Sequence, residues 1–240
     1  MLDNIRVVLV RTFHSGNIGS TARAMKTMGL SDLYLVNAKD YQQHQAMQMA
    51  MSAEDLVHNA KHVSSLLDAV SDCSVVIAST ARTRGYDLPM FDPEQAARKL
   101  CDAANNQKVA LVFGPERMGL SNEDLQFCKY RVMIPTSPDY SSLNLAAAVQ
   151  TLSYEIFKQY SQLNENADST QTNRVMPSIE NMERFYTHLE QTLNDTGFIF
   201  KKHPGEVMLK LRTLFNRAQM DQTELNIMRG ILSSFERNKD

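Results

Sequence analysis

The sequence predicts an α/β fold, a parallel sheet with helices on both faces, followed by a small helical extension. Two observations support this prediction. Over residues 1–160, apolar runs of strand length alternate with helical patterns, which is typical of parallel βαβ units. Beyond residue 176, apolar residues recur at helical spacing only.

Apolar or β-branched runs bounded by turn residues are the predicted strands. Ser74–Ser79 and Val109–Phe113 contain almost no polar side chains, which indicates strands buried on both faces. The predicted strands cover residues 5–11, 32–36, 74–79, 109–113 and 130–134.

The predicted helices begin and end at recognisable residues. Asn17 is a plausible N-cap for the first helix, and Gly29 ends it. Pro93 suits a first helical turn, and Ser121 is a candidate N-cap. Residues 47–51 alternate as a strand would, but their polar surroundings favour a loop and a helix start. The predicted helices cover residues 18–28, 57–70, 93–104, 122–125 and 143–160.

The chain divides at a polar segment. Residues 161–176 are predicted to be a linker, which separates a main domain, 1–160, from a helical C-terminal extension, 177–240. Because three helices make only a marginal core, we expect the extension to dock on another surface. Its predicted helices carry the stripes Ile179, Met182, Tyr186, Leu189 and Leu193; Val207, Leu211, Leu214 and Phe215; and Leu225, Met228, Leu232 and Phe235.

Composition excludes several classes of protein. A net charge of −2 and a pI near 6.3 exclude a strongly basic protein, so any nucleic-acid surface must be a local patch. The three cysteines have no C-x-x-C pair and are expected to be reduced core thiols. No leader or membrane-spanning run is recognisable. We therefore expect a cytoplasmic protein that does not enter a membrane.

His58 and His62 have the spacing of a metal-binding pair on a helix. They would share a face of the predicted helix 57–70, but a zincin would need glutamate where Asn59 stands. Two exposed polar histidines are therefore favoured, and we expect no metal site.

The segment Lys108–Asn122 organises the main domain. A buried strand ends at Gly114-Pro115, and a helix start follows at Ser121, the position where open α/β sheets bind ligands. Gly114 and Gly119 have the spacing of a phosphate-binding loop, but Leu120 replaces its lysine. A nucleotide-triphosphate switch is therefore disfavoured. Because Glu116 would repel a phosphate, a neutral or cationic ligand fits better there, although a purely structural turn is an open alternative.

Two further loops follow predicted strands and hold small or polar residues. They are Asn17–Arg23 and Ile134–Leu145. Each loop also has a purely structural interpretation. Asn17 and Ser142 could cap helices and have no further role, and Arg23 could be a charge in solvent. No G-x-S-x-G or G-x-G-x-x-G pattern is present, so hydrolase and nicotinamide chemistry have no support.

Taken in order, the three loops resemble the motifs of the SPOUT class of S-adenosylmethionine-dependent RNA methyltransferases. They contain N-x-G-x-x-x-R, then F-G-x-E-x-x-G-L-S, then Ile-Pro followed by Ser-Ser-Leu-Asn-Leu-Ala. The match covers residues 2–160. The helical extension and the run Ser-Thr-Ala-Arg-Thr-Arg at 79–84 resemble the branch called TrmJ, whose members methylate the ribose 2′-hydroxyl at position 32 of the tRNA anticodon loop.

The resemblance implies a trefoil knot in the C-terminal part of the main domain, an exception to the rule that chains do not knot. It also implies a homodimer with its sites at the interface, a tRNA substrate and S-adenosylmethionine as cofactor. The residues that it assigns to the cofactor are Ser79, Thr80, Ala81, Gly114, Glu116, Gly119, Ile134, Ser141, Ser142, Leu143 and Asn144.

The resemblance also suggests catalytic and RNA-binding residues. Arg23 would be catalytic, with Asn17 and Ser142 orienting the hydroxyl. Because guanidinium is essentially always protonated, Arg23 suits a phosphate contact better than a role as base. The candidates for RNA contact are Arg11, Arg82, Arg84 and Tyr86. An RNA-binding protein on the same scaffold without catalysis is the alternative, and a choice between cytidine and uridine stays open.

Overall fold

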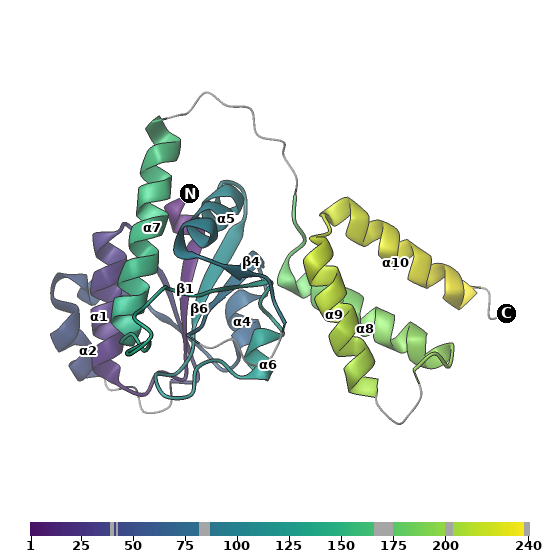
Figure 1. Cartoon of the computed structure of the whole chain (residues 1–240), viewed down its shortest axis with the longest axis horizontal. Helices are drawn as coiled ribbons and strands as arrows, with labels where there is room; N and C mark the ends of the chain where they lie inside the picture. The colour runs from purple at the N-terminus through teal and green to yellow at the C-terminus, as the bar shows by residue number, and fades with distance from the viewer. Residues whose placement is uncertain (39–40, 42, 82–86, 166–174, 200–203, 238–240) are drawn as a thin grey trace. The chain divides into compact units, whose positions relative to one another are not determined.

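The computed structural model describes residues 1–38, 41, 43–81, 87–165, 175–199 and 204–237. The chain forms two compact units, Met1–Thr170 and Gln171–Asp240. The first unit contains a sheet covered by helices, and the second contains helices (Figure 1). The division falls in the polar segment that was predicted to be a linker.

The sheet of the first unit is parallel throughout its described pairings, with the strand order β3-β2-β1-β6-β4-β7-β5. This confirms the predicted fold class. The strands are β1 (Ile5–Val10), β2 (Asp32–Val36), β3 (Lys61–Val63), β4 (Cys73–Ser79), β5 (Met90–Phe91), β6 (Lys108–Phe113) and β7 (Tyr130–Val132). The trefoil knot stays a prediction.

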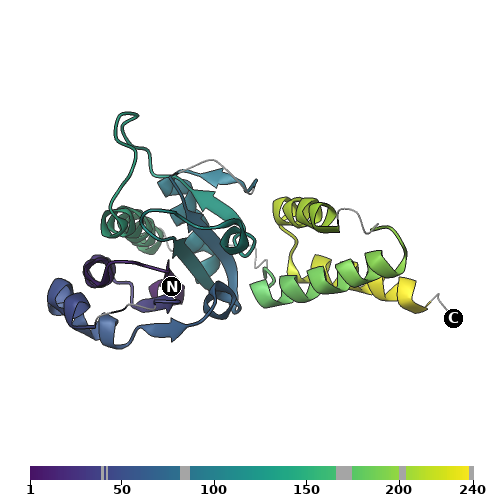
Figure 2. The same ribbon diagram turned by 90° about the horizontal axis from the view of Figure 1, so that it is seen from below.

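Helices cover both faces of this sheet (Figures 1 and 2). On one face, α1, α3, α5 and α7 bury their apolar residues against alternate strand residues such as Val7, Ile77 and Leu111, and α2 packs on α1. On the other face, α4 packs against β2 and β3. The helices are α1 (Ser15–Thr27), α2 (Gln43–Ala50), α3 (Glu54–His58), α4 (Leu66–Val70), α5 (Pro93–Ala104), α6 (Asn122–Leu125) and α7 (Leu145–Glu165), with short 3₁₀ turns at Leu2–Asn4 and Met51–Ala53.

The predicted single helix over residues 57–70 is wrong. The segment forms the end of α3, the edge strand β3 and the short helix α4. β3 pairs with β2, and Ser65 with Asp68 makes a capping box that starts α4. Consequently His58 and His62 do not share a helix face, because His58 ends α3 and His62 lies in β3.

Several predicted boundaries also need correction. Asn17 is not an N-cap, because α1 already begins at Ser15. The ambiguous residues 47–50 belong to α2, and β1 ends at Val10, before Arg11 with φ +50°. The last helix of the unit begins at Leu145, after Ser142, and runs to Glu165. β7 ends at Val132.

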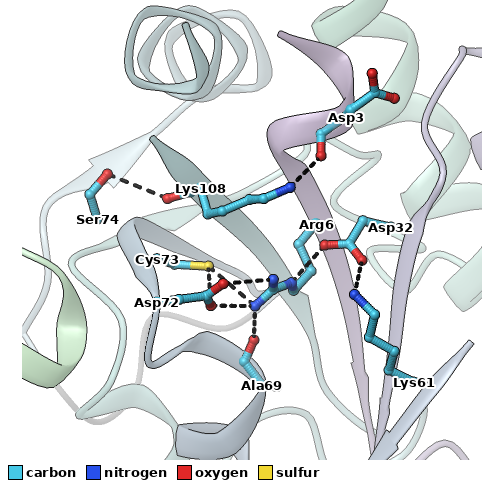
Figure 3. Close-up of polar contacts among 9 residues, drawn as sticks. All are labelled: Asp3, Arg6, Asp32, Lys61, Ala69, Asp72, Cys73, Ser74 and Lys108. Atoms are coloured by element: carbon cyan, nitrogen blue, oxygen red, sulfur yellow. Dashed lines mark hydrogen bonds and ion pairs between the residues drawn. The ribbon is translucent and has the colours of Figure 1, made fainter. Parts of the chain in front are cut away.

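Arg6 is a buried charge at the start of β1, where it joins two other elements (Figure 3). Its guanidinium donates to Asp32 (2.9 Å), to Asp72 (2.6 Å) and to the carbonyl of Ala69, and it lies over the ring of Tyr34. These contacts satisfy the charge that burial would otherwise penalise. Arg6 therefore fastens β1 to β2 and to the end of α4.

The second unit contains α8 (Ile179–Asp195), α9 (Pro204–Ala218) and α10 (Gln222–Arg237), as predicted. α8 is capped by Ser178 and is followed by Gly197 at φ +72°. Two predicted stripe residues, Leu214 and Phe235, are 45% and 51% exposed. The core that the unit does form contains Met182, Phe185, Tyr186, Leu189, Ile199, Met208, Met220, Leu225 and Leu232.

Candidate active site

A cavity of about 390 Å³ lies where β4, β6 and β7 end. These three strands are neighbours in the sheet, so the loops that follow them meet at one carboxyl edge. The volume is in the range of small-molecule sites. The cavity is lined by Ser79, Thr80, Ala81, Phe113, Gly114, Pro115, Glu116, Arg117, Met118, Gly119, Leu120, Leu125, Ile134, Thr136, Ser141, Ser142, Leu143, Leu145 and Ala148.

Gly114 allows the loop after β6 to fold tightly back on itself. A Cβ at this position would lie 2.4 Å from the backbone nitrogen of Leu120, a distance that non-bonded atoms do not reach. The loop is closed by a hydrogen bond from the Gly119 N–H to the Pro115 carbonyl (2.9 Å), with Gly119 at φ +70°. Glycine at 114 is therefore a requirement of the packing of this loop.

Glu116 joins this loop to the start of α1. Its carboxylate accepts hydrogen bonds from the side-chain amide of Asn17 (2.7 Å) and from the backbone N–H groups of Phe13 (3.1 Å) and His14 (3.4 Å). Burial raises the pKa of Glu116, but these hydrogen bonds outweigh it and leave the pKa below its ordinary value. The cavity wall consequently carries an ionised carboxylate at neutral pH.

Asn144 completes the connection between the three motif loops. Its amide donates to Oδ1 of Asn17 (3.1 Å), and its own Oδ1 accepts from the Ala146 N–H (2.9 Å) at the start of α7. The chain Glu116–Asn17–Asn144 thus contains one residue from each of the three loops. It fixes their relative positions around the cavity.

Arg11 lies outside the cavity lining and is held by an acid. Its guanidinium makes an ion pair with Asp124, whose carboxylate also accepts from the Ser121 N–H (2.8 Å) in the capping box of α6. Burial raises the pKa of Asp124, but the hydrogen bonds from Arg11 and Ser121 outweigh it and lower the pKa. Arg11 therefore stabilises the loop after β6, and its predicted RNA contact would have to share the guanidinium with Asp124.

The structure brings together nearly all residues that the sequence assigned to a cofactor. They line the cavity, with the exception of Asn144, whose side chain binds Asn17 and the α7 backbone. Arg23 is exposed on α1 and does not line the cavity. The RNA candidates Arg82, Arg84 and Tyr86 lie outside the described residues.

Other residues of the cavity wall were not predicted from the sequence. Arg117 and Met118 lie between Glu116 and Gly119, so the loop that carries the motif was the signal for them. Thr136 lies within the third motif loop, and Ala148 follows that loop in α7. The further missed residues are Phe113, Pro115, Leu120, Leu125 and Leu145.

Comparison with known proteins identifies the family of the chain. The model of the SpoU rRNA methylase family matches residues 4–154, and that of the tRNA methyltransferase TrmJ C-terminal domain matches residues 180–240. The chain belongs to the SpoU methylase family. Its relatives in this family include the tRNA (cytidine/uridine-2′-O-)-methyltransferases TrmJ of Salmonella choleraesuis and Escherichia coli O1:K1, each 51% identical over 98% of this chain and over 98% and 96% of the relative.

Solved structures of SpoU methylase relatives have the same fold. TrmJ from Z. mobilis ZM4 is 33% identical with a TM-score of 0.83, and the similarity covers 96% of this chain and 98% of that one. A probable methylase family protein from Haemophilus influenzae is 44% identical with a TM-score of 0.66, over 99% and 98% of the two chains. The resemblance to SPOUT methyltransferases and to their TrmJ branch is thus confirmed.

Proposed function

We propose that the protein transfers a methyl group from S-adenosylmethionine to a ribose 2′-hydroxyl of the tRNA anticodon loop, at a cytidine or uridine in position 32. The observation that supports this most directly is that the second and third motif segments line one cavity, and that Asn17 of the first motif is hydrogen-bonded to both of them through Glu116 and Asn144. The full-length similarity to tRNA (cytidine/uridine-2′-O-)-methyltransferases supports the choice of substrate. A tRNA substrate also agrees with the predicted cytoplasmic location.

The residues of the cavity fit S-adenosylmethionine. The wall includes small side chains and loop backbone from 79–81, 114–120 and 141–143, whose N–H, C=O and hydroxyl groups can hydrogen-bond an adenine and a ribose. The ionised Glu116 in the wall is compatible with a cationic ligand. When bound, S-adenosylmethionine supplies a methyl group already activated on a sulfonium.

The chain must then align the hydroxyl and assist loss of its proton. We assign Ser142, exposed in the cavity wall, to orienting the 2′-hydroxyl. Asn17 is a positioning residue, because both ends of its amide are bound by Glu116 and Asn144. Arg23 holds a phosphate of the target nucleotide by its guanidinium fork.

We further propose that the active enzyme is a homodimer in which Arg23 serves the cavity of the partner subunit. Arg23 is exposed and is absent from the wall of its own cavity. Among the described residues, no carboxylate forms an ion pair with it. A catalytic Arg23 is consistent with a second copy of the chain that brings it to the site.

The test is to map ribose methylation in tRNA treated with the purified protein and S-adenosylmethionine. We expect a single 2′-O-methyl group at position 32. It should form in transcripts that carry cytidine at this position, in those that carry uridine there, or in both kinds of transcript. Methylation at another position would contradict the proposed target. Binding of tRNA without transfer of a tritiated methyl group would instead support a catalytically inactive RNA-binding protein.

A further inference from the structure

Phe13 is a large apolar side chain that the fold holds in solvent beside the cavity. It is 63% exposed, follows the carboxyl end of β1 and does not line the cavity itself. Its backbone N–H donates to Glu116, which does line the cavity (3.1 Å). The position of Phe13 is therefore coupled to the loop that forms the cavity wall.

Two further side chains, those of Arg117 and His14, lie next to the Phe13 ring. The guanidinium carbon of Arg117, a cavity-lining residue, lies 5.7 Å from the ring centroid, which is within cation–π range. The His14 ring stands edge-on to Phe13 with centroids 4.9 Å apart. Within the described part of the chain, no carboxylate forms an ion pair with Arg117, so its charge remains available to a ligand.

We infer that Phe13 and Arg117 form a platform on which an unpaired nucleobase of the substrate tRNA stacks, next to the ribose that enters the cavity. Unpaired bases of RNA loops are characteristically bound by stacking on aromatic side chains and on guanidinium planes. The platform offers both kinds of stacking surface, the Phe13 ring and the Arg117 guanidinium. It is also attached directly to the cavity wall, through the hydrogen bond from Phe13 to Glu116. This inference rests on the proposed function. It assigns to Phe13 and Arg117 the role of positioning the anticodon loop at the cavity.

The first test compares steady-state kinetics of Phe13→Ala and Phe13→Trp. We expect Phe13→Ala to raise the KM for tRNA about tenfold, whereas the KM for S-adenosylmethionine stays unchanged, because Phe13 is outside the cavity. Phe13→Trp should restore the KM for tRNA, since indole also stacks. Arg117→Met, which keeps the stem and removes the charge, should likewise raise the KM for tRNA.

Phe198→Ala is the matched control, because Phe198 is 65% exposed and lies in the other unit. It should leave the KM for tRNA unchanged. An equal effect of both alanine variants would overturn the inference. So would conversion of Phe13→Ala from dimer to monomer in sedimentation, since Phe13 would then be a subunit contact.

The second test does not depend on methyl transfer. The chain contains no tryptophan, so Phe13→Trp provides the single tryptophan of the variant, whose indole emission reports on the platform. We expect its emission to be quenched by a tRNA anticodon stem-loop and not by the stem duplex alone. Absence of quenching at saturating stem-loop would overturn the inference, whereas quenching without any methylation by the wild type would refute only the proposed function.

Discussion

Gly114 shows how strongly a single residue can determine the site. Gly114→Ala should destabilise the protein by about 1–3 kcal/mol through overpacking and weaken S-adenosylmethionine binding, because the new methyl group collides with backbone atoms of the loop. Calorimetry of cofactor binding and urea denaturation would measure both effects.

Gly230→Ala is the control for this substitution. Gly230 lies within α10, and a Cβ there would meet nothing within 4 Å. Alanine should therefore stabilise the protein by roughly 0.5–1 kcal/mol through helix propensity, without an effect on cofactor binding. Similar behaviour of the two variants would contradict the steric role of Gly114.

Substitution of Arg23 by lysine tests whether the site needs a bidentate guanidinium or only a positive charge. Arg23→Lys keeps the positive charge but loses bidentate binding of phosphate, so we expect kcat/KM for tRNA to fall at least about tenfold. The affinity for S-adenosylmethionine should be unchanged, because the role proposed for Arg23 is to hold a phosphate of the tRNA. Nearly full turnover by the lysine variant would contradict the phosphate-holding role.

At the scale of elements, the Arg6 cluster links stability to pH. Burial raises the pKa of Asp72, but hydrogen bonding to Arg6 and its charge outweigh this and lower the pKa. A lowered folded-state pKa means that the carboxylate stabilises the fold above the unfolded pKa of about 3.9, and that this contribution is lost as pH falls through the folded value.

Asp72→Asn should therefore lower the free energy of unfolding at pH 7, and its difference from the wild type should shrink as pH falls below about 4. Urea denaturation across pH would show this. Asp87→Asn, at an exposed position, is the control and should change stability little at any pH. A deficit of Asp72→Asn that is constant with pH would contradict the role of the ion pair.

The elements also show what the sequence could and could not predict. Runs such as Val109–Phe113 are apolar enough to be recognised as strands, because both of their faces are buried. β3 contains Lys61, His62 and Val63, and only its pairing with β2 makes it a strand. No local pattern identifies such an edge strand, so the segment was predicted to be helical.

The candidate site was likewise predictable only in part. Its loops were found because their glycines and small polar residues follow strands that end at one edge of the sheet. The connection Glu116–Asn17–Asn144 could not be predicted, because local capping rules gave Asn17 a different role. Tertiary hydrogen bonds determined its position instead.

At the scale of the whole molecule, the proposed dimer predicts complementation between two inactive variants. If Arg23 serves the partner's cavity, Arg23→Ala and Ser142→Ala affect different sites of a mixed dimer, and one site is left intact. Mixing the variants after reversible dissociation should restore about a quarter of wild-type activity. The measurement is tritiated methyl transfer to tRNA.

The complementation experiment contains its own control. If Arg23 acts within its own subunit, every site of a mixed dimer carries one substitution, and activity stays absent. Recovery of the untagged variant with an affinity-tagged copy of the other would establish that mixed dimers had formed. A monomeric wild-type protein with full activity would contradict the proposed assembly altogether.

The hydrogen-bonded chain Glu116–Asn17–Asn144 has a consequence for the order of folding. Its two hydrogen bonds join residues that are separated by 99 and by 127 positions in the sequence. The contacts therefore form only with the loss of conformational entropy that closing such long loops requires. A nascent polypeptide that still lacks Asn144 cannot complete the connection. The cavity is thus assembled only after most of the first unit has left the ribosome, and incomplete chains should not compete for the proposed cofactor.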